Sequence, residues 1–97
     1  MDSKLSNMAL VKAQDLINNN YFDHNSPTYG SPFDMMKKFQ INYNAAGENI
    51  AKGQPTPERV MNDWMNSEGH RANILRSSFT HIGIGYFKGA WVQEFTG

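Results

Sequence analysis

Three short polar segments hold the side chains of this sequence that are best suited to chemistry. His24 lies in the segment HNSP, Glu48 lies in GENI, and His70 lies in GHRANIL, at the first turn of an expected helix. If the fold brings them together, two imidazoles and a carboxylate line one cleft. Such a group could hold a divalent metal ion through neutral imidazole nitrogens, or it could transfer protons.

The spacing of these residues does not identify a metal site by itself. Specific zinc motifs place two ligands three or four residues apart, whereas His24 and His70 lie in distant segments. The residues also allow structural roles, in which each histidine ties its loop to a neighbouring backbone and Glu48 accepts backbone N–H groups near Gly47. A serine nucleophile is less favoured, because no G-x-S-x-G motif is present.

The composition narrows the class of protein. The chain has 97 residues, which predicts a single domain over residues 1–97. Nine basic and nine acidic side chains give a formal charge of zero, so nucleic acid is not an expected partner. The absence of cysteine excludes disulfides, zinc fingers and thiol catalysis. No apolar run approaches the ~18 residues of a membrane span, and the first residues carry no apolar signal segment.

The elements that must position the polar segments follow a simple order. Amphipathic spacing predicts a helix over residues 4–19, and a cap followed by proline predicts helices from residue 32 to about 39 and after Pro57. Residues 40–53 are ambiguous, with a short strand or an extended turn around Ile50. Alternating apolar residues with a tight turn at Lys88 and Gly89 predict a C-terminal hairpin. Helices followed by a hairpin indicate an α+β fold.

The same polar segments carry a resemblance to a known family. The segments HNSP, GENIA, WMNS with GHRANIL, and the tail HIGIGY with WVQEFT resemble the CAP superfamily of cysteine-rich secretory, antigen 5 and pathogenesis-related proteins. They are most similar to its cysteine-free bacterial SCP-like extracellular branch. The match extends over nearly all of residues 2–97, and four motifs in the expected order make it specific.

The resemblance implies a three-layer α–β–α sandwich with a small antiparallel sheet and a cleft of two histidines and two acids. His24 and His70 match the family histidines, which makes them the expected ligands of zinc or another divalent cation. Glu48 matches the first acid. The position of the second acid falls at Ser67, and the nearest carboxylate is Glu68, so both are candidate ligand-binding residues.

Asn73 is a further ligand-binding candidate, because it lies on the same expected helix as His70 and could orient the cleft or cap that helix. The favoured function is a secreted domain that binds a divalent metal or a small or lipidic ligand without turnover. One alternative is a metal-assisted hydrolase, resembling a protease, that uses His24, His70 and Glu48, with the glutamate as general base. The other is a structural or protein-interaction domain whose cleft is vestigial.

The resemblance also implies that a helix usually precedes the segment that starts this sequence. A face that this helix would cover is then expected to be open and apolar. We expect self-association or a protein partner there, through the helix of residues 4–19 or the strand near residues 90–96. An extracellular location is inferred from the resemblance alone.

Overall fold

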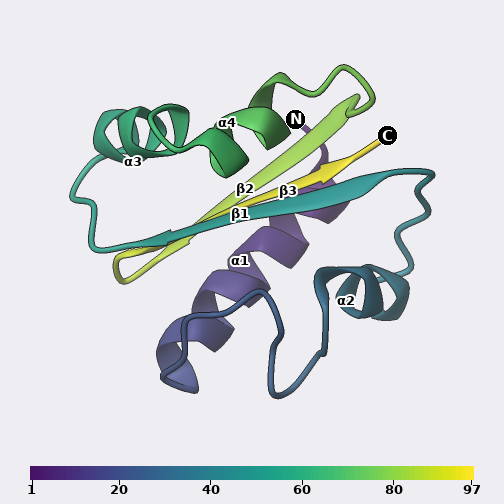
Figure 1. The fold of residues 1–97 in the computed structure, drawn as a ribbon. Helices are drawn as coiled ribbons and strands as arrows, with labels where there is room; N and C mark the ends of the chain where they lie inside the picture. Colours follow the sequence, from purple (N-terminus) through teal and green to yellow (C-terminus); the bar gives the residue numbers. More distant parts are fainter.

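The computed structural model describes residues 1–97 as a three-layer arrangement around a small sheet (Figure 1). The elements in chain order are α1 (Ser3–Asn18), α2 (Pro32–Lys38), β1 (Ala46–Lys52), α3 (Pro57–Met65), α4 (Glu68–Leu75), β2 (His81–Phe87) and β3 (Ala90–Thr96). The sheet is antiparallel with the order β1–β3–β2. Helices α1 and α2 lie on one side of it and α3 and α4 on the other. The predicted α+β sandwich is confirmed.

Helices α1, α2 and α3 begin where local sequence signals place them. Asp2 caps α1 by accepting the N–H of Leu5 at 2.9 Å. Ser31 starts α2 with a capping box to Asp34, followed by proline at the first helical position. Thr56 caps α3 by accepting the N–H of Arg59 at 3.2 Å, and Pro57 takes the first helical position. These caps satisfy backbone donors that would otherwise lack partners, so the boundaries follow from local chemistry.

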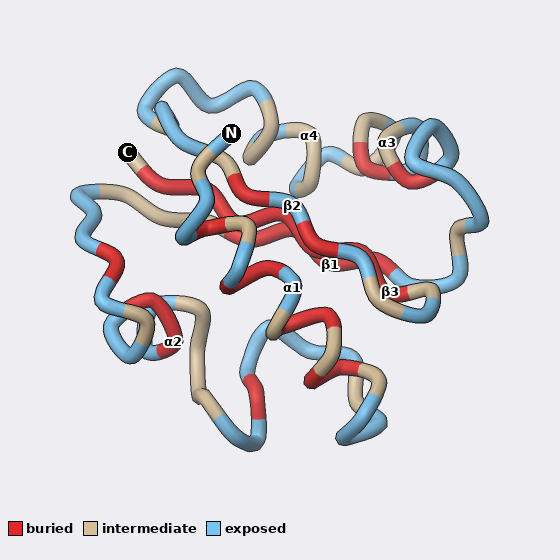
Figure 2. The backbone as a smooth tube through the Cα atoms, turned by 180° about the vertical axis from the view of Figure 1, so that it is seen from behind, coloured by how far each residue is buried: buried red, intermediate tan, exposed pale blue.

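The central strand of the sheet is β3, and every residue of it is buried. The prediction of an open apolar side is therefore wrong for residues 90–96. Most apolar residues of α1 are also buried against the core, although Leu10 is 38% exposed, and self-association stays a prediction. Figure 2 shows buried residues concentrated along the sheet and recurring at successive turns of α1. Exposed apolar side chains occur on several elements, and two of them, Ile84 and Tyr86, lie on the edge strand β2 at 37% and 50% exposed.

The ambiguous segment of residues 40–53 contains the other edge strand, β1. It pairs with β3 so that Glu48 lies opposite Glu94 and Ile50 opposite Val92. On its outer edge, the carbonyl of Glu48 accepts the side-chain amide of Asn73 at 3.3 Å. The carbonyl of Ile50 accepts the indole N–H of Trp64, also at 3.3 Å. These bonds tie α3 and α4 to β1 and so determine where the polar segments meet.

Candidate functional site

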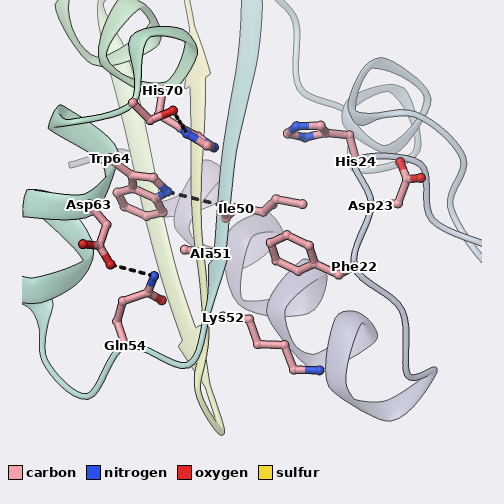
Figure 3. Close-up of a pocket in the computed structure, with 11 residues that line it drawn as sticks. Phe22, Asp23, His24, Ile50, Ala51, Lys52, Gln54, Asp63, Trp64 and His70 are labelled. Carbon is pink, nitrogen blue, oxygen red and sulfur yellow. Dashed lines mark hydrogen bonds between the residues drawn. The ribbon is translucent and has the colours of Figure 1, made fainter.

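An open cavity of about 550 Å³ lies along the β1 edge of the sheet (Figure 3). Its walls come from three parts of the chain: the loop after α1, strand β1, and the helices α3 and α4 with their connections. His24 and His70 point toward each other from opposite sides of β1. Phe22, Ile50 and Trp64 form an apolar part of the wall. The structure thus brings the two predicted histidines into one cleft.

Two buried groups hold His24 in place. Its Nδ1 lies 2.8 Å from Oε1 of Glu48, whose side chain is only 1% exposed, whereas the histidine side chain is 50% exposed. The ammonium of Lys12 donates to the backbone carbonyls of Asp23 and His24 at 2.9 and 2.8 Å. The hydrogen bond to Glu48 raises the pKa of His24, against the smaller opposing effect of burial. The cationic form of His24 is therefore more stable than that of a free histidine.

His70 has the opposite electrostatic environment. Its Nδ1 is 2.8 Å from Oγ of Ser67, the N-cap of α4, and this hydroxyl makes no capping bond to the helix. Its backbone carbonyl accepts the side-chain amide of Asn49 at 3.1 Å. Burial lowers the pKa of His70, and the nearby charge of His24 lowers it further. The cleft thus places an imidazole whose pKa is raised opposite one whose pKa is lowered.

A cluster of ionisable groups lies behind His24, inside the protein. Lys12 on α1, Glu48 on β1 and Glu94 on β3 are 1%, 6% and 0% exposed. Burial raises the pKa of Glu94 well above its usual range, and the adjoining Glu48 raises it further. Burial lowers the pKa of Lys12, although both glutamates oppose that shift. Such groups are rarely buried in a small domain unless they are paired.

Of the remaining predicted site residues, one lines the cleft and two do not. Ser67 lines the cleft, whereas Glu68 is exposed and does not line it. Asn73 does not line the cleft either, because its side chain donates to the carbonyl of Glu48 and to Oδ1 of Asn49. Of the two candidates for the second acid position, only Ser67 touches a cleft histidine.

Sequence reasoning missed Lys12 and Glu94. A signal for Lys12 was present, because it lies four residues after Met8 and four before Leu16, within the apolar stripe of its helix. A charged residue on such a stripe must be paired or solvent-exposed at its tip. Glu94 carried no comparable local signal, because its neighbours in β3 do not show which strand it faces.

The predicted metal site can be compared with the side chains that the cleft offers. No group of three or more His, Cys, Asp and Glu side chains is arranged to hold a metal ion. Two imidazoles are the protein ligands on offer, each with Nδ1 engaged, by Glu48 or by Ser67. The buried carboxylate of Glu48 faces His24 rather than the open cavity, which does not suit the general base of a hydrolase.

The sequence matches a known protein family over nearly its whole length. The family model described as "CAP: Cysteine-rich secretory protein family" matches residues 1–95. The chain belongs to this family, and the resemblance found in its sequence is confirmed. The protein YkwD of Bacillus subtilis is 63% identical over 99 residues, covering 100% of this chain and 38% of its own length. The membrane protein YlbC of the same organism is 36% identical, covering 97% of this chain and 27% of its own length.

Solved structures agree with this assignment. An extracellular protein containing an SCP domain from Bacillus anthracis matches with a TM-score of 0.95 and 36% identity, over 98% of this chain and 32% of its own. An outer surface protein of Borrelia burgdorferi matches with a TM-score of 0.88 and 25% identity, over 98% and 74%. The chain thus spans less than two fifths of the length of either Bacillus subtilis relative. No helix in the structure is long and apolar enough to cross a membrane.

Proposed function

We propose that this chain is an extracellular binding domain whose cleft holds a small ligand with an anionic head and an apolar body, without turnover. The observation that supports this best is that His24 and His70 face each other across the cavity, where the pKa of His24 is raised and that of His70 is lowered. His24 can donate a charge-assisted hydrogen bond to an anion, and His70 can donate or accept a second bond. The apolar body would lie against Phe22 and Ile50, further along the same cavity.

The extracellular location rests on the described relatives. The similar protein of Bacillus anthracis is described as extracellular, and that of Borrelia burgdorferi as an outer surface protein. Absence of turnover is proposed because the carboxylate that could act as a base is buried and engaged by His24. The role of Glu48 is then to keep His24 charged and oriented.

Decanoate is a probe that matches both halves of this cleft. We expect decanoate to perturb the imidazole NMR signals of His24 and His70, with much weaker effects from acetate and from decanol at equal concentration. His24→Ala should reduce decanoate affinity by about tenfold or more, the range of a lost hydrogen bond to a charged group. His81→Ala is the matched control, because His81 is exposed and outside the cleft. Equal binding to both variants would refute the anionic-head role of His24.

The pH dependence of decanoate binding has a definite sign. Because the pKa of His24 is raised above its usual ~6.5, the cationic form persists to higher pH than in a free histidine. Decanoate affinity should therefore be highest below the folded pKa of His24 and fall as the pH rises through it. Affinity that is constant from pH 6 to 9 would contradict this prediction.

A divalent cation is the second candidate, favoured by one observation. Both Nδ1 atoms are engaged, which leaves the Nε2 atoms of His24 and His70 to face a ligand. A bound cation would supply a positive centre for a ligand oxygen. We expect weak Zn²⁺ binding by calorimetry that strengthens as the pH rises, because protons compete for the same nitrogens. This sign is opposite to that for decanoate, so one pH series separates the two candidates. Unchanged heats in His24→Ala/His70→Ala would rule out this site.

A further inference from the structure

Glu94 is a fully buried carboxyl group with no hydrogen-bond partner for either oxygen. It lies on the central strand β3, directly opposite Glu48 on β1. The Oε2 atom of Glu48 is also buried and without a partner, whereas its Oε1 is engaged by His24. Three orphaned carboxyl oxygens therefore adjoin one another behind the cleft. Each unmade hydrogen bond of this kind is costly, so the arrangement needs an explanation.

Ionisation of both of two adjoining carboxyl groups in a protein interior is strongly disfavoured, because like charges repel in a medium of low polarity. One ammonium, that of Lys12, faces the pair from α1. Strand β2 contributes no side chain there, since the residue opposite Glu94 is Gly83. The cation bonded to the pair is the imidazole of His24, and it engages Oε1 of Glu48. Neither oxygen of Glu94 has a hydrogen-bond partner, so nothing there compensates a negative charge on Glu94. Glu94 is therefore the better candidate for the neutral member, since it is fully buried without a partner, and burial raises its pKa.

We propose that Glu94 is a positioning residue of the cleft: as a neutral carboxylic acid it donates its proton in a hydrogen bond to Oε2 of Glu48. That bond fixes the carboxylate whose other oxygen holds His24. The orphaned oxygen of Glu48 gains a donor, and the chain Glu94–Glu48–His24 links the core to the cleft. The relevance of this hydrogen-bonded series to ligand binding rests on the proposed function of His24. The hydrogen bonds themselves do not depend on that function.

The test compares Glu94→Gln with Glu94→Leu. A glutamine keeps a donor of the same shape as the neutral acid, whereas leucine fills the space without one. We expect Glu94→Gln to leave the pKa of His24, measured by NMR without any ligand, within about 0.3 units of the wild type. Glu94→Leu should lower that pKa by about one unit, the scale of one lost hydrogen bond in the chain. Thr96→Val is the control, a buried polar position on the same face of β3.

Infrared spectroscopy supplies a second measurement that does not depend on the leucine variant. The wild type at neutral pH should show a carboxylic acid C=O band that Glu94→Gln lacks. Absence of that band in the wild type would overturn the proposal even if Glu94→Leu does not fold. The proposal would also fail if folded Glu94→Leu kept the wild-type pKa of His24. It would fail equally if Glu94→Gln lowered that pKa as much as Glu94→Leu does.

Decanoate binding to the same variants separates the two proposals. If Glu94 positions His24, decanoate should bind Glu94→Gln within about twofold of the wild type and bind Glu94→Leu several-fold more weakly. If the wild type does not bind decanoate but the titrations of His24 follow the expected pattern, the proposed function fails and the positioning role stands.

Discussion

Replacing Lys12 by methionine is expected to destabilise the domain by about 3–5 kcal/mol, the range for removing one partner of a buried charge pair. The Lys12 side chain is buried, and its ammonium donates to the carbonyls of Asp23 and His24. Methionine fills the space but leaves these carbonyls without a donor. It also leaves the carboxylate of Glu48 in the core with no compensating ammonium from α1.

Urea unfolding at pH 7 measures this loss, with Lys4→Met as the matched control. Lys4 lies on the same helix but is exposed, so its replacement should change stability by no more than about 0.5 kcal/mol. A Lys12→Met variant within about 1 kcal/mol of the wild type would show that the ammonium is not needed to balance the buried carboxyl groups.

The second large effect is expected from adding a single methyl group to β2. A Cβ built at Gly83 would lie 2.1 Å from the backbone carbon of Leu5, and one at Gly85 would lie 2.3 Å from the backbone nitrogen of Leu10. Helix α1 therefore packs directly on the glycine backbone. Gly83→Ala or Gly85→Ala must push α1 away from the sheet, at a cost of about 3 kcal/mol or more, the upper range for overpacking a core.

Gly69→Ala is the control for this substitution. A Cβ at Gly69 meets nothing within 4 Å, and the residue lies in α4, where alanine is a better helix former than glycine. We expect Gly69→Ala to raise stability by up to about 1 kcal/mol. Thermal unfolding of the three variants side by side checks both signs. A Gly83→Ala variant as stable as Gly69→Ala would mean that α1 can shift on the sheet without loss.

Lys12 and the two glycines of β2 belong to one contact, the packing of α1 on the sheet. This helix therefore closes the core and also carries the ammonium that steadies the loop of His24. A variant that displaces α1 should therefore also disturb the His24 imidazole signals. Displacement of α1 thus connects the stability of the core to the geometry of the cleft.

Local chemistry in the sequence determined most of the helices and the hairpin. Asp2, Ser31 and Thr56 each satisfy the first backbone donors of the helix that follows, and this requires only neighbouring residues. The alternation in β2 and the left-handed turn at Lys88 and Gly89 likewise act within the hairpin. The family motifs further indicated that His24, Glu48 and His70 belong to one cleft.

Only the tertiary structure decided what lies behind that cleft. Strand β1 was ambiguous because its partner, β3, comes about forty residues later, and pairing over such a distance leaves no local pattern. The same pairing places Glu94 opposite Glu48, and the packing of α1 on the sheet brings Lys12 toward both. The protonation of buried groups depends on which charges and how much water surround them. Those surroundings exist only once α1 and the sheet have packed together, so the sequence identified the two histidines and Glu48 but not Lys12 and Glu94, which are buried behind them.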